Sequence, residues 1–180
     1  MDQQSDRERF EELYRSTYQD VVAYCRRRIP AADSEDVVAE TYLVAWRRLD
    51  EVLSAEFPLA WLYAVAYRTI SNQHRSTRRI MTLRKRLQGL PTSTVLPPDA
   101  IAEARADLVR SLASLERLSQ KDRELIRLAA LERLSYDEIA QVVGKSPAAV
   151  RSQLFRARVH LREVFDSLDE DSESEDEANP

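Results

Sequence analysis

Two stretches of this sequence carry basic side chains without any carboxylate, and the chemistry that such stretches can do is the binding of phosphate. Residues 57–98 contain seven lysines and arginines and no acid. Residues 139–162 also lack acids, and their charge comes from Lys145, Arg151, Arg156, Arg158 and Arg162. A chain with two surfaces facing nucleic-acid phosphates needs such a distribution. Two solvated helix faces would produce the same pattern, so charge alone leaves both interpretations open.

Residue types that serve enzymes and metal sites are sparse. Cys25 is the only cysteine and falls in register with apolar residues, so we expect a core thiol, with a redox sensor as the alternative. His74 and His160 lie far apart without a neighbouring ligand pair, which argues against a zinc site and against a catalytic triad. The only glycines, Gly89 and Gly144, are too few for a Gly-rich phosphate loop. We therefore expect neither an enzyme nor a cofactor.

Apolar runs are short throughout the chain, and none approaches the about 20 residues that cross a bilayer. The first residues, MDQQSDRERFEELY, are charged and lack the apolar core of a signal peptide. A cytoplasmic protein without membrane insertion is therefore expected.

The net charge of −4 conceals an uneven distribution of acids. Residues 163–180 carry nine acids and no base, whereas the rest of the chain carries 27 basic and 22 acidic side chains. Like charges at this density, with almost no apolar residues, cannot bury enough surface to fold, so we expect residues 166–180 to form a disordered acidic tail. Two roles for it remain open, solubility and competition with DNA for the basic side chains.

Helical periodicity predicts an all-α chain of two small domains joined by a flexible linker, the first domain spanning residues 1–79. Its first helix is expected over 10–29, with Pro30 ending it. A second helix should begin at an Asp33-Ser34 cap and run to about residue 49, followed by a short connection. A third should open at Pro58 and run to about residue 79, apolar in its first half and basic in its second.

The second domain is expected over residues 100–165, after a linker over 80–99 that contains Gly89 and three prolines. We predict four helices in it, the first over about 100–115. Ser119, Ser135 and Ser146 are the predicted N-caps of the other three. A short helix, a turn at Gly144 and a longer basic helix form the pattern of a helix-turn-helix, which can place Arg, Ser and Gln side chains against DNA.

Three segments in this order resemble the extracytoplasmic-function (ECF) group of bacterial RNA polymerase sigma factors. They are DSEDVVAETYLVAWRRLDEV (33–52), FPLAWLYAVAYRTISNQHRSTRR (57–79) and LERLSYDEIAQVVGKSPAAVRSQLFRARVHLRE (131–163). The third segment alone is shared by many regulators, whereas the combination is highly specific. The resemblance covers residues 10–165 and implies a sigma factor that binds core polymerase and directs promoter-specific transcription initiation.

The resemblance also implies roles for particular residues. The polymerase clamp helices of the β′ subunit would be contacted by Asp33, Glu35, Asp36 and Glu40. The promoter's minus-ten element would be contacted by Arg68, Asn72, Arg75, Arg78 and Arg79. Trp61 keeps apolar register with Val65, so we expect a core residue there, with a wedge between bases as the alternative. The minus-thirty-five element would be contacted by Ser146, Ala148, Ala149, Arg151, Ser152, Gln153 and Arg156. Gln153 stands where the family commonly has a basic residue, which puts the promoter preference in doubt.

The partners implied by the resemblance are core RNA polymerase, through its β′ clamp helices and its β flap, promoter DNA, and an anti-sigma protein. A stand-alone helix-turn-helix regulator is the alternative, and it accounts for residues 131–162 but leaves the acidic helix and the other basic helix unexplained. A helical protein-interaction module would account for the acidic tail but not for two acid-free basic stretches.

Overall fold

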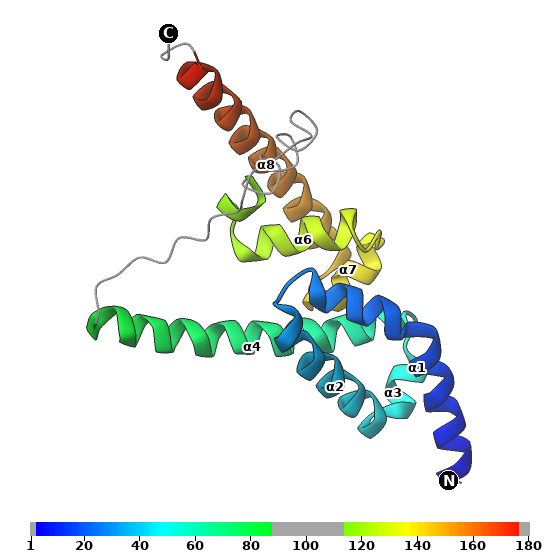
Figure 1. Cartoon of the computed structure of the whole chain (residues 1–180). Helices are drawn as coiled ribbons and strands as arrows, with labels where there is room; N and C mark the ends of the chain where they lie inside the picture. The colour runs from blue at the N-terminus through cyan, green and yellow to red at the C-terminus, as the bar shows by residue number, and fades with distance from the viewer. Residues whose placement is uncertain (1–2, 88–113, 177–180) are drawn as a thin grey trace. The chain divides into compact units, whose positions relative to one another are not determined.

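The computed structural model describes residues 3–87 and 114–176, with side chains described as far as Gln73 in the fourth helix and Ser167 in the last. The chain divides into two compact units, residues 1–91 with 140–145 and residues 92–139 with 146–180. Every regular element within 3–87 and 114–176 is an α-helix (Figure 1). The all-α prediction is therefore confirmed.

The first unit is a bundle of four helices: α1 (Gln3–Arg26), α2 (Ala31–Arg47), α3 (Leu49–Ser54) and α4 (Pro58–Leu87). Helix α2 packs against α1 and α4, which also contact each other, and α3 packs against α4 and α2 (Figure 1). Tyr24 and Tyr63 stack at the centre, with ring centroids 4.5 Å apart. Cys25 is fully buried, as expected of a core thiol.

The boundary between α1 and α2 differs from the prediction. Helix α1 begins at Gln3 and ends at Arg26, before a turn over residues 27–29, because the residue before a proline disfavours the helical conformation. Helix α2 begins at Ala31 with Pro30 as its N-cap and no side-chain cap. Ser34 is instead buried and donates its hydroxyl to the Ala31 carbonyl oxygen at 2.7 Å. The predicted Asp33-Ser34 cap is therefore wrong.

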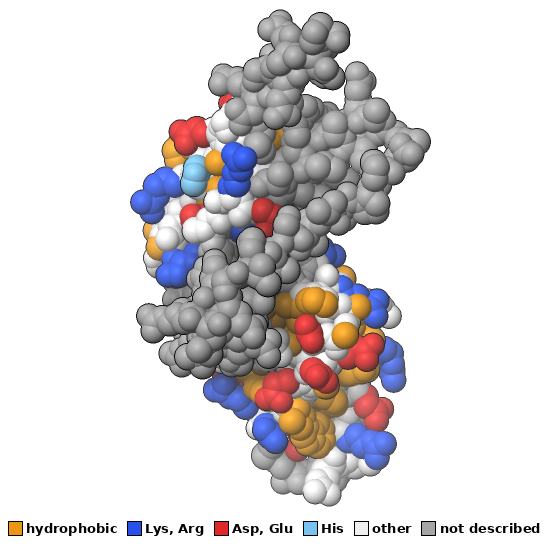
Figure 2. Space-filling view, turned by 60° about the vertical axis from the view of Figure 1, so that its left-hand side comes forward, with side chains coloured by type: hydrophobic (Ala, Val, Ile, Leu, Met, Phe, Trp, Pro, Cys, Tyr) orange, Lys and Arg blue, Asp and Glu red, His pale blue; other side chains and the backbone are white. Residues whose placement is uncertain are grey.

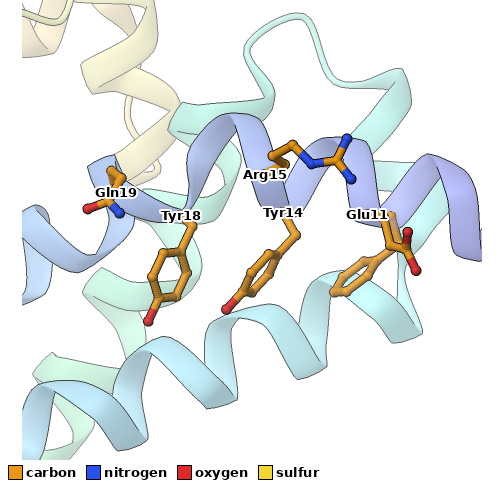
Figure 3. Close-up of a pocket in the computed structure, with 6 residues that line it drawn as sticks. Glu11, Tyr14, Arg15, Tyr18 and Gln19 are labelled. Carbon is orange, nitrogen blue, oxygen red and sulfur yellow. The ribbon is translucent and has the colours of Figure 1, made fainter.

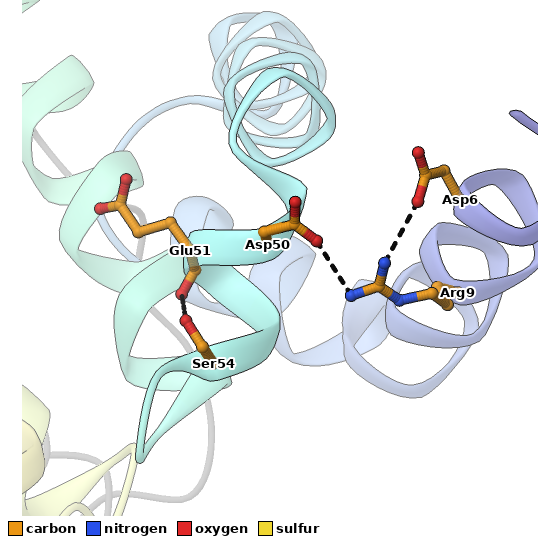
Figure 4. A network of polar contacts seen from close by, with 5 residues as sticks. All are labelled: Asp6, Arg9, Asp50, Glu51 and Ser54. Carbon is orange, nitrogen blue, oxygen red and sulfur yellow. Dashed lines mark hydrogen bonds and ion pairs between the residues drawn. The ribbon is translucent and has the colours of Figure 1, made fainter. Parts of the chain in front are cut away.

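Helix α3 lies where the sequence predicted only a short connection. Leu49 and Val52, one turn apart, are buried. Arg9 on α1 bonds Asp6 and, across the helices, Asp50 of α3, both at 3.1 Å (Figure 4). Exposed ion pairs contribute at most about 1 kcal/mol. The burial of the two apolar side chains therefore explains most of the anchoring of α3.

Helix α4 begins at Pro58, as predicted, but continues to Leu87 rather than ending near Arg79. The first eight residues assigned to the linker are thus helical, because neither glycine nor proline interrupts the chain before Gly89. The rest of the predicted linker lies outside the described residues.

The second unit and the chain continuous with it contain α6 (Gln120–Ala130), α7 (Tyr136–Val143) and α8 (Pro147–Asp176), and α6 packs against α8. Of the helix predicted over 100–115, residues 114 and 115 are described and are helical, and the rest lies outside the described residues. Ser119 caps α6, with its hydroxyl oxygen accepting from the Asp122 amide at 3.2 Å. The core side chains are almost all aliphatic: Leu118, Leu125, Ile126, Leu128, Ile139, Val150, Leu154 and Ala157.

The acidic end of the chain is helical, which contradicts the predicted disorder. Helix α8 continues through Asp176, and residues 177–180 lie outside the described part. No glycine or proline occurs between Pro147 and Pro180, so nothing in the sequence stops the helix once α8 has formed.

In the described part of the chain, no helix is both long and apolar enough to cross a membrane.

Candidate nucleic-acid interface

The turn between α7 and α8 fixes where the last helix begins. Gly144 has a φ of 67°, a left-handed conformation that glycine adopts without strain. The Lys145 amide donates to the Ala140 carbonyl oxygen at 3.0 Å, which closes the end of α7. The Ser146 hydroxyl accepts from the Ala149 amide at 3.3 Å, and Pro147 takes the first helical position. The predicted helix-turn-helix is therefore formed with the predicted cap.

The outer face of α8 presents the side chains that the sequence assigned to DNA. Val150, Leu154 and Ala157 are buried on the inner face of the helix. The predicted contact residues that are exposed are Ser146, Ala148, Arg151, Ser152 and Arg156, whereas Ala149 and Gln153 are half-buried. Small side chains at the start of the helix allow a close approach to a groove, and the arginines and serine can bond phosphates or base edges.

The start of α7 is held by a reciprocal pair of hydrogen bonds. The Ser135 hydroxyl accepts from the Glu138 amide at 3.3 Å, and the Glu138 carboxylate accepts from the Ser135 amide at 2.8 Å. The predicted cap at Ser135 is therefore present, as part of a capping box with Glu138. Tyr136, the first residue of α7, lies under Arg151 of α8, whose guanidinium carbon is 5.3 Å from the ring centroid. Sequence reasoning missed this contact, because its partners lie fifteen positions apart in the chain.

Helix α4 positions the second set of predicted DNA contacts. Arg68 and Asn72 are exposed and lie one turn apart on the same face. Trp61 is buried, as predicted, and its indole nitrogen donates to the Glu51 carboxylate of α3 at 3.2 Å. The backbone of Arg75, Arg78 and Arg79 belongs to α4, but their side chains lie outside the described residues.

The predicted acidic contact residues Asp33, Glu35, Asp36 and Glu40 are all exposed on α2. Their neighbours Val37, Val38 and Thr41 are buried, so α2 has a clear inner and outer side. On the face of the first unit that Figure 2 shows, acidic side chains lie among hydrophobic ones. Such a surface suits a partner that carries basic and apolar side chains together.

An aromatic cluster on α1 and α2 was not expected from the sequence. Phe10, Tyr14 and Tyr18 fall on the apolar period of the first helix, which would bury them, but Tyr14 is 39% exposed and the other two are half-buried. The buried stripe of α1 instead runs through Leu13, Thr17 and Val21. The three aromatic residues recur at intervals of four residues, and this spacing was the available signal in the sequence. Because an α-helix has 3.6 residues per turn, a row with a period of four drifts away from the buried side of the helix.

The α1 members of the cluster, Phe10, Tyr14 and Tyr18, line an open surface pocket of about 530 Å³ (Figure 3). Tyr14 lies 4.7 Å from Tyr42 and 4.8 Å from Tyr18 between ring centroids. Burial raises the pKa of the Tyr42 hydroxyl to about 12, and the hydrogen bond with Thr17, at 2.8 Å, opposes that shift. No group of three or more His, Cys, Asp or Glu side chains among the described residues could hold a metal ion.

Comparison with known proteins finds two family models that match the chain in the order of its units. The model for sigma-70 region 2 matches residues 13–80, and the model for sigma-70 region 4 matches residues 110–161. The first match contains α2 and most of α4, and the second contains the helix-turn-helix.

Relatives match over most of the chain. The RNA polymerase sigma factor NccH of Alcaligenes xylosoxydans xylosoxydans is 32% identical over 146 residues, which cover 77% of this chain and 76% of NccH. The ECF RNA polymerase sigma-E factor of Escherichia coli strain K12 is 28% identical over 166 residues, 87% of this chain and 86% of that protein. The structure of CnrH in complex with the cytosolic domain of CnrY is similar with a TM-score of 0.58 and 26% identity, over 88% of each chain.

Proposed function

Because this chain belongs to the ECF group of RNA polymerase sigma factors, we propose that its two units divide polymerase docking and promoter reading between named surfaces. The chain binds core RNA polymerase and directs promoter-specific transcription initiation. The observation that carries this function is the match to both sigma-70 regions in one chain. A stand-alone helix-turn-helix regulator would leave the match over residues 13–80 without a purpose.

The acidic outer side of α2 docks on the clamp helices of the polymerase β′ subunit in this proposal. Asp33, Asp36 and Glu40 follow one another at three- and four-residue spacing, so they share one side of the helix. Their exposure supports a role in binding, because no described neighbour covers them. Complementary charge gives such a contact its orientation and its association rate.

Co-purification with core polymerase tests this surface. The double charge reversal Asp36→Arg with Glu40→Arg should abolish capture of core enzyme and leave the fold intact, because exposed charges contribute little to stability. Glu8→Arg with Glu12→Arg is the matched control, since these exposed acids have the same spacing on α1. Normal capture by the α2 variant, or equal loss in both variants, would show that the surface is assigned wrongly.

Helices α4 and α8 bind the two promoter elements in this proposal. Arg68 and Asn72 of α4 contact the minus-ten element, where Arg75, Arg78 and Arg79 further along the helix hold phosphates. The α8 side chains that contact the minus-thirty-five element are Ser146, Ala148, Ala149, Arg151, Ser152, Gln153 and Arg156. Their position on or next to the outward face of a recognition helix supports this assignment.

Promoter binding by the reconstituted holoenzyme tests α8. Arg151→Ala with Arg156→Ala should weaken promoter binding. The slope of log affinity against log salt concentration should fall in magnitude by about one for each phosphate contact that is lost. Capture of core polymerase should not change. Arg117→Ala with Lys121→Ala removes two exposed charges from the same unit outside α8 and serves as the control. Equal run-off transcription by wild type and the α8 variant on every promoter would refute the assignment.

A pre-melted template separates the role of α4 from that of α8. Asn72→Ala and Arg68→Ala should lower run-off transcription from an intact promoter more than from one whose minus-ten region is already unpaired. The α8 variant should lower transcription from both templates alike. Equal effects of the α4 variants on the two templates would show that these side chains act before strand separation.

The remaining partners follow from the family. CnrH has been solved in complex with the cytosolic domain of CnrY, and we infer a regulatory anti-sigma partner for this chain as well. The chain itself is no enzyme in this proposal, since nucleotide addition belongs to the polymerase, and it acts in the cytoplasm where the polymerase works. Pull-down of a separately expressed candidate, with loss of core polymerase capture, tests the anti-sigma partner.

A further inference from the structure

The contact between Tyr136 and Arg151 joins the first residue of α7 to the outer face of α8. The guanidinium carbon lies 5.3 Å from the ring centroid, within the about 6 Å over which a cation is attracted to an aromatic face. Tyr136 is 37% exposed and Arg151 is exposed. The pair therefore lies at the surface that α8 offers to DNA, not in the core of the unit.

Both ends of this contact stand on fixed backbone. The bonds between Ser135 and Glu138, at 2.8 and 3.3 Å, hold the residue immediately before Tyr136. The Ser146 cap holds the first turn of α8, one turn before Arg151. Because both helix starts are capped, the ring has a defined place in which to meet the guanidinium.

The geometry of a guanidinium explains what the contact achieves. The ring attracts the face of the planar group, whereas all five N–H donors point outward in its plane. A stacked arginine can therefore still bond a phosphate or the edge of a guanine with two parallel hydrogen bonds. Stacking also restricts a long side chain before it binds, which lowers the entropic cost of binding.

We propose that Tyr136 is a positioning residue, which holds the Arg151 guanidinium over its ring and so presents the donors of that arginine to the minus-thirty-five element. The inference rests on the proposed DNA contact of α8. It adds to that surface a residue of α7 that lies outside the predicted contact set. The aromatic ring, and not the tyrosine hydroxyl, is the part that acts.

A double-mutant cycle with the reconstituted holoenzyme tests the inference. Affinity for a labelled promoter duplex is measured for wild type, Tyr136→Leu, Arg151→Ala and the double variant. Tyr136→Leu should weaken binding about two- to fivefold, the range of an exposed cation–π contact. In the Arg151→Ala background the same substitution should have no effect. Tyr136→Phe keeps the ring and should bind within about twofold of wild type.

Two controls separate positioning of Arg151 from a structural role of Tyr136. Thermal unfolding of the Tyr136 variants shows whether the unit is still folded, and a control substitution shows whether loss of any exposed apolar side chain weakens binding. Leu131→Ala removes another exposed apolar side chain of the second unit and should leave promoter affinity unchanged. Additive effects of Tyr136→Leu and Arg151→Ala would overturn the inference and leave the proposed DNA contact of Arg151 standing. Equal losses of affinity in Tyr136→Phe and Tyr136→Leu would also overturn the inference, because they would assign the effect to the hydroxyl. An Arg151→Ala variant that binds normally would overturn the proposed contact of Arg151 and the inference with it.

Discussion

The two units hold their helices in different ways. In the first unit, packing positions α1, α2 and α4 around a core that contains aromatic rings, and α2 begins at Pro30 without a side-chain cap. In the second unit and the turn continuous with it, a serine hydroxyl caps each of α6, α7 and α8, around a core that is mainly aliphatic. The start of α2 thus depends on tertiary contacts, whereas the helix starts of the second unit depend on local hydrogen bonds.

This difference explains which functional surface each unit can support. The docking surface proposed for the outer side of α2 needs a helix whose inner side is packed firmly, and the buried Val37, Val38 and Thr41 provide that packing. A recognition helix must present its first two turns in a defined register, and the cap at Ser146 with the turn at Gly144 sets that register. The predictions below separate the two units by experiment.

The largest effect is expected from cavities in the two cores. Leu62 and Leu154 are almost completely buried, and replacing either with alanine should cost about 2–5 kcal/mol. Trp46 and Trp61 are the only tryptophans and both lie in the first unit, so tryptophan fluorescence reports that unit alone. In urea, Leu62→Ala should lower the midpoint of the fluorescence transition. Leu154→Ala should shift the unfolding transition followed by circular dichroism and leave the transition followed by fluorescence unchanged. Equal shifts in both signals for both variants would show that the units unfold as one body.

A dependence of stability on alkaline pH is expected for the first unit. Burial raises the pKa of Tyr42 from 10 to about 12 in the folded state, so the folded state retains a proton that the unfolded state loses. The stability contributed by neutral Tyr42 is present below pH 10 and is lost as the pH rises from 10 to about 12. The midpoint of the fluorescence transition in urea should fall over that range, and it should fall less in Tyr42→Phe. Parallel decline in both proteins would show that Tyr42 is not the titrating group.

Helix caps provide a smaller and more direct contrast. Ser135→Ala removes the cap of α7 and should lower the free energy of unfolding, measured by circular dichroism, by about 1 kcal/mol. Ser34→Ala is the same substitution at the serine that sequence alone would have made the cap of α2. Among the described hydrogen bonds, its hydroxyl accepts none from a backbone amide of the first turn. We therefore expect the free energy of unfolding, measured by fluorescence, to change by less than about 0.5 kcal/mol. A loss of about 1 kcal/mol or more there would mean that Ser34 stabilises the start of α2 after all.

The smallest effect is expected from the acidic end of α8. At about 1.5 Å per residue, the helix places Asp166, the first acid beyond Phe165, about 22 Å along its axis from Arg151, well beyond the Debye length of about 8 Å at physiological salt. Truncation after Phe165 should therefore change affinity for random duplex DNA by less than about twofold at about 0.15 M salt. A much larger gain in affinity would indicate that the segment leaves the helix and competes with DNA for the basic side chains.

Local signals were sufficient wherever a short stretch of chain decides the conformation. The caps at Ser119, Ser135 and Ser146 and the starts of α4 and α8 at proline were predicted correctly. The residues that the resemblance assigned to binding are exposed on α2, and most of those on α8 are exposed too, because helical periodicity alone separates the two sides of an amphipathic helix. Membership in the family, too, is carried by three segments of sequence.

Tertiary structure decided what depends on residues far apart in the chain. The start of α2, the formation of α3 and the partial exposure of Phe10, Tyr14 and Tyr18 depend on how helices pack, which no single segment contains. The contact between the Arg151 guanidinium and the Tyr136 ring requires both the turn at Gly144 and two capped helix starts. A sequence specifies hydrogen bonds within a turn through neighbouring residues, whereas a contact across helices exists only after burial has fixed where each helix lies.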